Sequence, residues 1–172
     1  MSPASPTIVI ELLHQDAFVP CRATEESVGY DLCAYLRGRR VACSDGTQRW
    51  ELGASGAEHE NPWLEIAPGV TALVPLGFKA ALPAGYEAQI RPRSGTTFKK
   101  GLLVPNAPGT IDADFPDEWM VLLRNGAPLP TRIEHGERIA QMVLHRYEVL
   151  PFERGRVGVS TSRVGGFGST GR

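Results

Sequence analysis

Cysteine is scarce in this sequence and has no metal-binding spacing. The three cysteines are Cys21, Cys33 and Cys43, an odd number without a CxxC pair, and the four histidines are scattered along the chain. Three cysteines cannot close a disulfide framework, and no Cys/His cluster has the spacing of a structural zinc site. We therefore expect a reducing, cytoplasmic compartment and no structural zinc.

Long apolar runs are also missing. The longest uncharged apolar stretch, residues 66–78, is interrupted by two prolines and two glycines. It is too short and too broken to form a membrane-spanning helix. Residues 1–7 lack the basic start and the apolar run of a signal peptide. We expect no membrane partner.

Neither sign of charge is in clear excess. The chain has 18 Lys and Arg against 19 Asp and Glu, a formal net charge of −1. Nucleic-acid-binding domains usually carry a basic surface, so no direct nucleic-acid binding is expected. The patterns GxSxG, HExxH and HxE with PCxxC are absent as well, which removes the corresponding hydrolase, metalloprotease and zinc-deaminase templates.

Glycine and proline, in contrast, are frequent, with 19 and 14 occurrences in 172 residues. Interior prolines disfavour long helices, while the 42% hydrophobic content suffices for a core. Short β-type runs separated by turn residues predict an all-β sandwich, barrel or jelly roll. These runs are 8–13, 72–78, 86–91, 102–104, 119–123 and 139–147. The only helix that we expect is short and spans residues 94–100.

The domain organisation is predicted to be simple. Residues 1–164 form one β domain, and 165–172 form a glycine-rich C-terminal arm too flexible to order itself. Residues 37–62 differ from their surroundings, with four arginines and a Gly-Ala-Ser-Gly patch. We interpret 37–62 as a surface insertion containing a hairpin around 44–46. A solvated loop is its default role, and a partner contact through its arginines is the alternative.

Five pieces of the chain can carry chemistry. In the piece 106–115, Asp112 and Asp114 would share one face of an extended segment, and apolar neighbours could desolvate Asp112 enough for it to act as a base. In 92–95, Arg93 and Ser94 precede or begin the expected helix and suit an anion. In the glycine-rich tail 165–171, Phe167 could stack on a flat ligand. The pieces 28–32 and 136–141 are nondescript alone, and each of the five also has a purely structural interpretation.

Taken in order, these five pieces resemble the five motifs of the homotrimeric dUTPases. The spacing between 92–95 and 106–115 is also similar to that of the family, and residues 64–69 resemble its connecting strand. The resemblance implies a distorted jelly-roll or β-barrel fold with one short helix, assembled as a trimer with shared active sites. It also implies hydrolysis of dUTP to dUMP and pyrophosphate with Mg²⁺ as cofactor, which keeps uracil out of DNA and supplies dUMP for dTMP synthesis.

The resemblance assigns roles residue by residue. Asp112 would be the catalytic base that activates water for attack on the α-phosphorus, and Asp31 would hold Mg²⁺ through water. Phosphate would be bound by Arg93, Ser94, Gly95, Gln141, Arg163, Ser169 and Thr170. Uracil and deoxyribose would be bound by Asn106, Gly109, Thr110, Ile111, Phe115 and Phe167. Arg138 is expected to be structural and to pair with Asp114.

The sequence departs from the family pattern at three places. Phe115 stands where the family usually has Tyr, and Pro116-Asp117 follow where a basic or polar residue and Gly are common. The usual position of the tail arginine holds Ser162, which leaves Arg163 or Arg172 for the γ-phosphate.

Two other functions remain open from the sequence. A dCTP deaminase, or a bifunctional deaminase–dUTPase, shares the fold but needs a glutamate-bearing motif, and Glu118 is the only glutamate near the hairpin. A non-catalytic trimeric nucleotide sensor is the other, although a pure binder has no need of Asp112 as a base.

Overall fold

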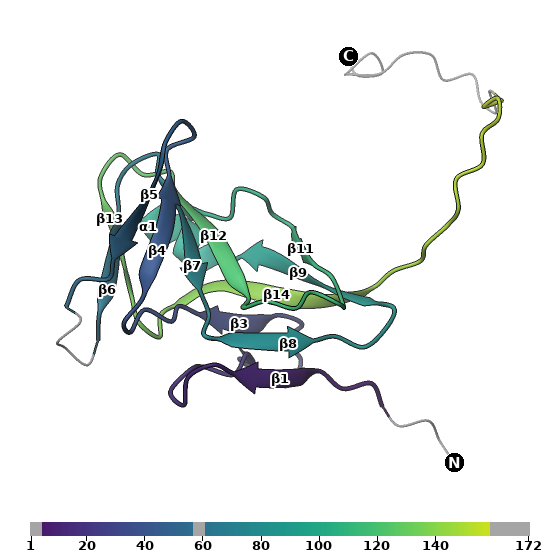
Figure 1. Ribbon diagram of the computed structural model, residues 1–172, viewed down its shortest axis with the longest axis horizontal. Coiled ribbons are helices and arrows are strands. Elements are labelled where there is room, and N and C mark those ends of the chain that lie inside the picture. The colour runs from purple at the N-terminus through teal and green to yellow at the C-terminus, as the bar shows by residue number, and fades with distance from the viewer. Residues whose placement is uncertain (1–4, 57–60, 159–172) are drawn as a thin grey trace.

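The computed structural model describes residues 5–56 and 61–158, and the regular structure within them is almost all β-strand (Figure 1). The only α-helix among these residues is α1 (Ser94–Lys100), with the predicted bounds. It ends at Gly101, whose φ of 65° is the left-handed conformation that glycine adopts at helix ends. The strands are β1 (Val9–Leu12), β2 (Cys21–Arg22), β3 (Tyr30–Cys33), β4 (Arg40–Ser44), β5 (Arg49–Gly53), β6 (Trp63–Ile66), β7 (Thr71–Pro75), β8 (Phe78–Ala81), β9 (Tyr86–Pro92), β10 (Leu102–Leu103), β11 (Gly109–Ile111), β12 (Met120–Asn125), β13 (Thr131–Glu134) and β14 (Arg138–Arg146).

The strands form two five-stranded sheets and two pairs of strands. One sheet has the order β10-β12-β7-β4-β5 and the other β11-β9-β14-β3-β2, while β1 pairs with β8 and β13 pairs with β6. All of these pairings are antiparallel. The predicted all-β, jelly-roll-like fold is confirmed. The described sheets are open, and none of them closes into a barrel.

The core lies between the sheets and contains the largest buried side chains, Trp119 and Phe78, whose rings are 5.5 Å apart. The predicted run 72–78 proves to be two strands in different sheets, because the chain turns at Gly77 with a φ of 78°. A Cβ at Gly77 would also come within 2.9 Å of the Tyr35 ring. A backbone reversal against an aromatic ring therefore requires glycine here.

The segment 37–62 corrects one expectation. Its hairpin around residues 44–46 is confirmed, since β4 and β5 pair in register from Arg40–Gly53 to Ser44–Arg49. The interpretation as a surface insertion is wrong for β4, however. The other edge of β4 pairs with β7, and its residues Val41 and Cys43 are buried in the core. β4 is thus an interior strand of the sheet.

No helix among the described residues is long and apolar enough to cross a membrane. The three cysteines are free, with Cys43 buried and Cys21 exposed.

Candidate functional site

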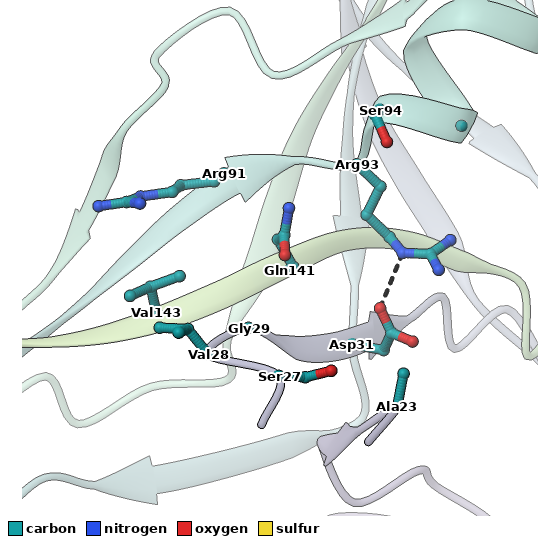
Figure 2. A pocket seen from close by; sticks show the side chains of 11 residues that line it. Ala23, Ser27, Val28, Gly29, Asp31, Arg91, Arg93, Ser94, Gln141 and Val143 are labelled. Carbon is teal, nitrogen blue, oxygen red and sulfur yellow. Dashed lines mark ion pairs between the residues drawn. The ribbon is translucent and has the colours of Figure 1, made fainter. Parts of the chain in front are cut away.

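A row of side chains across three neighbouring strands forms the floor of a pocket of about 730 Å³ (Figure 2). Asp31 on β3 lies opposite Gln141 on β14, and Gln141 lies opposite Arg91 on β9. Residues directly opposite each other in adjacent strands project from the same face of a sheet. The pocket is lined by Ala23, Ser27, Val28, Gly29, Asp31, Arg91, Arg93, Ser94, Gly95, Gln141 and Val143. It therefore unites the pieces 28–32, 92–95 and 136–141, which are far apart in the sequence.

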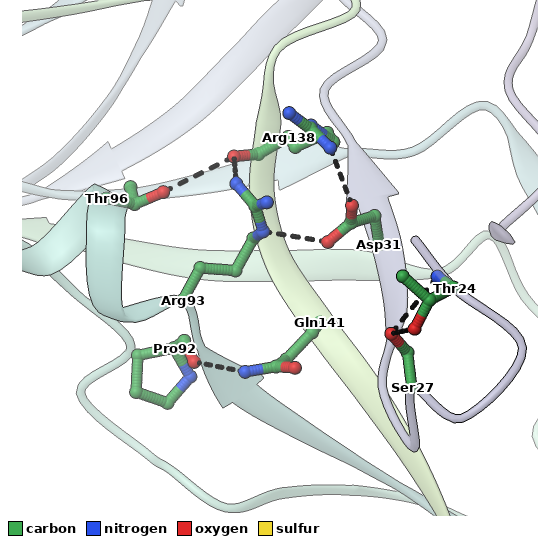
Figure 3. A network of polar contacts seen from close by, with 8 residues as sticks. All are labelled: Thr24, Ser27, Asp31, Pro92, Arg93, Thr96, Arg138 and Gln141. Carbon is green, nitrogen blue, oxygen red and sulfur yellow. Dashed lines mark hydrogen bonds and ion pairs between the residues drawn. The ribbon is translucent and has the colours of Figure 1, made fainter. Parts of the chain in front are cut away.

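Asp31 is the centre of the charged end of this pocket. Its Oδ1 lies 2.7 Å from Nε of Arg93, and its Oδ2 lies 3.1 Å from Nη1 of Arg138 (Figure 3). The Asp31 side chain is only 11% exposed, so both of its oxygens need such partners. Arg138 is therefore bound to Asp31, and the expected pairing of Arg138 with Asp114 is wrong.

The main chain of Arg138 joins the same network. Nη1 of Arg93 and Oγ1 of Thr96 both donate hydrogen bonds to its carbonyl oxygen, at 3.3 and 3.4 Å. Arg93 thus contacts β3 through Asp31 and β14 through Arg138. These contacts hold the Arg93 guanidinium at the junction of β3, β14 and the start of α1.

Gln141 is held in the middle of the pocket. Its Nε2 donates to the carbonyl of Pro92 at 2.9 Å. Its Oε1 faces Gly29, where an added Cβ would lie 2.2 Å from that oxygen. A larger residue at position 29 would displace the Gln141 amide, because the backbone immediately before β3 approaches that amide closely.

Ser94 and Gly95 occupy the rim of the pocket at the first residues of α1. Both are exposed, and Arg93, which immediately precedes the helix, makes no side-chain capping hydrogen bond. The Ser94 hydroxyl and the peptide N–H groups are consequently available to an anionic ligand.

The piece 106–115 lies elsewhere in the described chain. β11 pairs with β9 at the edge of the sheet, with Gly109 opposite Ile90 and Ile111 opposite Ala88. The sequence predicts that Asp112 and Asp114 share one face of an extended segment. This prediction is wrong, because the strand ends at Ile111, before both aspartates. Asp112 is also exposed in the single chain rather than desolvated.

Within this piece, Asn106 and Gly109 are in close contact. A Cβ on Gly109 would come within 2.8 Å of Nδ2 of Asn106. Thr110 is exposed and Phe115 is 38% exposed, with Phe115 bordering a separate depression beside β1 and β8. None of these residues lines the pocket around Asp31.

Sequence reasoning missed Arg91 as a pocket residue. Arg91 is two residues before Arg93 on an extended strand, and this period-2 spacing is the signal that could have found it. Its Nη2 donates to Oε1 of Gln89 at 2.6 Å, and Nε2 of Gln89 donates to Glu87 at 2.8 Å. Figure 2 shows Arg91 extending away from the Arg93–Asp31 pair.

A thiol also lies next to the charged cluster. Cys33 on β3 is opposite Arg138 on β14. Burial raises the pKa of the Cys33 thiol, and the nearby Cys21 and Asp31 act in the same direction. Cys33 therefore stays protonated at neutral pH and does not supply a nucleophile.

The described residues contain no group of three or more His, Cys, Asp or Glu side chains able to hold a metal ion. Asp31 nevertheless fits a contact through metal-bound water. Each carboxylate oxygen has two acceptor sites, so the ion pairs with Arg93 and Arg138 leave capacity for a hydrogen bond from water.

The remaining predicted residues, Arg163, Phe167, Ser169 and Thr170, lie outside the described part of the chain. The segment that leads to them runs away from the two sheets (Figure 1). Its apolar side chains are largely exposed, with Val149 at 82% and Phe152 fully exposed.

Comparison with known proteins gives a family. The dUTPase family model matches residues 62–171, more than half of the chain. Among solved structures, a dUTPase from Streptococcus mutans is 25% identical with a TM-score of 0.62, and the match covers 83% of this chain and 98% of that one.

Two phage structures share the fold at lower identity. The dUTPase of Staphylococcus bacteriophage 80alpha with dUPNHPP is 22% identical with a TM-score of 0.72, covering 96% of this chain and 98% of that one. A mutant dUTPase from phage phi11 of S. aureus, described for its coordination of a structural Mg(II) ion, is 18% identical with a TM-score of 0.62, covering 88% and 97%. With three of the five sequence pieces gathered in one pocket and the family model matched over most of the chain, this protein belongs to the dUTPase family and is a dUTP diphosphatase.

Proposed function

We propose that the protein hydrolyses dUTP to dUMP and pyrophosphate in active sites shared between the subunits of a homotrimer. In the cell this reaction would keep uracil out of DNA and supply dUMP for dTMP synthesis. One observation carries the proposal. Within one chain, the pocket around Asp31 is separate from the piece 106–115, which is expected to bind the base and to activate water.

The pocket around Asp31 suits the triphosphate. Arg93 presents a planar guanidinium to phosphate oxygens, and Ser94, Gly95 and Gln141 add neutral hydrogen-bonding groups beside it. Asp31 neutralises part of the charge of Arg93 and Arg138, and its ion pairs hold both guanidinium groups in place. The pocket is therefore ordered before a ligand arrives. In this proposal the tail residues Arg163, Ser169 and Thr170 complete the phosphate contacts.

The base and sugar would be bound by the piece 106–115. The contact between Asn106 and Gly109 supports this role, since it brings a side-chain amide against a main-chain segment that could together pair with uracil. Thr110 and Ile111 would continue this surface, and Phe115 would pack on the deoxyribose and crowd a 2′-hydroxyl. Phe167 of the tail would stack on the uracil ring and exclude water.

Distance argues that these two parts belong to different subunits. Ile111, next to Asp112, pairs with Ala88, which lies five residues before Arg93 on β9. At about 3.4 Å per residue in a strand, that is a separation of roughly 17 Å. A water activated at Asp112 would then lie far from a phosphate held at Arg93 of the same chain, which favours an arrangement in which a second copy supplies one of them.

The exposed C-terminal segment supports the same assembly. Val149, Leu150, Phe152 and Val157 are each at least 75% exposed on a segment that leaves the body of its own chain. Apolar side chains in such a position gain stability by packing on another molecule. In the trimer this segment would lead the tail to an active site of a neighbour.

The chemistry follows from Asp112. Its carboxylate would take a proton from a water whose oxygen attacks the α-phosphorus, while the bond from that phosphorus to the bridging oxygen breaks and pyrophosphate leaves. Mg²⁺, when bound to the triphosphate, supplies neutralisation of the charge on the leaving group. Asp31 would orient the metal-bound water from the pocket side.

Pyrophosphate release from dUTP, dCTP, dTTP and UTP, each with and without Mg²⁺, tests the proposal. Of the four nucleotides, we expect only dUTP to release pyrophosphate rapidly, and we expect this release to depend strongly on Mg²⁺. Ammonia release from dCTP would instead identify a deaminase. Turnover of UTP at a rate near that of dUTP would contradict the role given to Phe115.

A further inference from the structure

A second depression lies beside the phosphate pocket and shares Arg93 and Gly95 with it. It has a volume of about 340 Å³, and its remaining lining residues are Thr96, Lys99, Lys100, Glu137 and Arg138. Four of its seven lining residues are therefore cationic and one is a carboxylate. The roles derived above leave Lys99 and Lys100 without any function.

Helical spacing and strand pairing explain why the cations gather here. On α1, Lys99 lies three positions after Thr96 and Lys100 lies four positions after it. The three side chains therefore lie on one face of the helix. Thr96 is bonded to the main chain of Arg138, which brings this face against the start of β14. The depression is the space between that helix face and the turn that carries Glu137 and Arg138.

The ion pairs leave the depression with excess positive charge. Lys100 lies 2.6 Å from Glu137, and Arg93 and Arg138 share the single carboxylate of Asp31. Within residues 5–56 and 61–158, Lys99 makes no recorded ion pair, and its side chain is exposed. Four cations thus face two carboxylates, and two positive charges remain uncompensated.

We propose that this depression is an anion subsite that takes inorganic pyrophosphate as it leaves the neighbouring phosphate pocket. The identity of the anion rests on the proposed function, because pyrophosphate is the product of that reaction. Arg93 belongs to both depressions, so a diphosphate can move from one to the other without losing its guanidinium contact. Lys99 is the binding cation that distinguishes the subsite from the phosphate pocket.

Calorimetric titration with sodium pyrophosphate, in the absence of Mg²⁺, tests the subsite. We compare the wild type with Lys99→Gln and with Lys79→Gln, which removes the same charge on β8, away from both depressions. We expect Lys99→Gln to weaken pyrophosphate binding about three- to tenfold, and Lys79→Gln to change it less than twofold. Equal affinities of the two variants would overturn the proposal.

A second titration separates the subsite from the phosphate pocket. With the phosphate pocket saturated by dUPNHPP, pyrophosphate should still bind, and Lys99→Gln should still weaken it. Complete loss of pyrophosphate binding in the presence of the analogue would overturn the subsite. Failure of dUPNHPP to bind, or of dUTP to be hydrolysed, would instead contradict the proposed function, while the comparison with pyrophosphate alone would still decide the subsite.

Discussion

Gly29, which immediately precedes β3, and Gln141 on β14 are in such close contact that a Cβ at position 29 would lie 2.2 Å from Oε1 of Gln141. The atom in the way is the far end of a flexible side chain, and the backbone of Gly29 is not in the left-handed region. The clash is therefore relieved by moving the Gln141 amide rather than by moving the sheet. The contact orders the pocket more than it stabilises the fold.

Gly29→Ala should consequently separate activity from stability. We expect a change in the free energy of unfolding below about 1 kcal/mol, because Gly29 lies just before β3 with a backbone conformation that alanine also adopts. We expect at least a tenfold fall in kcat/KM for dUTP, since Gln141 is displaced from the carbonyl of Pro92. Gly53→Ala is the matched control, because a Cβ there meets nothing within 4 Å. Similar kinetics for the two variants would show that the position of Gln141 is unimportant.

Asp31→Asn should lower stability as well as activity. The substitution keeps the shape but leaves Arg93 and Arg138 without their shared carboxylate, next to a side chain that is only 11% exposed. Breaking a fully buried ion pair costs about 3–5 kcal/mol, and the partial exposure of both arginines reduces our expectation to about 2 kcal/mol. Urea unfolding measures it. Glu51→Gln, which breaks an exposed pair with Arg40, should cost less than about 0.5 kcal/mol.

His135 makes stability depend on pH. Its Nδ1 accepts a hydrogen bond from the main-chain N–H of Leu36 at 3.1 Å, so the folded state needs this nitrogen unprotonated. Burial lowers the pKa of His135, and the positive charge of Arg37 acts in the same direction, while Asp16 opposes them. A histidine whose pKa is lower in the folded state binds fewer protons there than in the unfolded chain. Its contribution is complete above the unfolded pKa of about 6.5 and is lost as the pH falls toward the folded pKa.

We expect the free energy of unfolding to decrease between pH 7.5 and pH 5, as followed by urea titration. His135→Asn keeps an acceptor for Leu36 but does not titrate, so this variant should lose part of the pH dependence. The exposed His145 provides the comparison. If His135→Asn and His145→Asn retained the same slope as the wild type, the stability change would have to come from other groups.

The sequence predicts local structure well where short-range chemistry decides it. The helix 94–100 has the predicted bounds, and the run 86–91 corresponds to β9 (Tyr86–Pro92). In the segment 37–62 the arginines suggest a solvated loop, whereas β4 is an interior strand. In β4 the alternation of exposed and buried residues, with Val41 and Cys43 facing the core, was the available signal. Arg39 compensates its charge by pairing with Glu118, far away in the sequence.

The site could be predicted less completely, because its partners are chosen by strand register. The family resemblance assigns site residues to the pieces 28–32, 92–95 and 136–141, and residues from all three pieces line one pocket. Arg138 was given the wrong carboxylate, since its bond to Asp31 spans 107 positions and depends on the pairing of β14 with β3. The period-2 spacing of Arg91 and Arg93 is a weak signal alone, and it gains its meaning from the strand register that sets Arg91 opposite Gln141.

Asp112→Asn should abolish turnover while preserving binding. Asparagine keeps the shape of the side chain but cannot accept a proton from the attacking water. We expect kcat for dUTP to fall by about 10²–10⁴-fold, the usual contribution of a general base. The affinity for dUPNHPP, measured by calorimetry, should stay within about threefold. Asp114→Asn, a neighbouring exposed aspartate, is the control, and equal losses of kcat in both variants would remove Asp112 from its proposed role.

Mixing two inactive variants should restore activity if the sites are shared. Arg93→Gln damages the pocket but leaves Asp112 intact, while Asp112→Asn does the reverse. Within one chain, Ala88, which pairs with Ile111 next to Asp112, is roughly 17 Å along the strand from Arg93. In trimers reassembled from equal amounts of both variants, about a quarter of the sites would combine an intact pocket with an intact Asp112 from another subunit. We therefore expect pyrophosphate release at about a quarter of the wild-type rate after unfolding and joint refolding, and far less when each variant is refolded alone. A mixture that stays inactive although each variant reassembles would mean that one chain supplies both parts of the site.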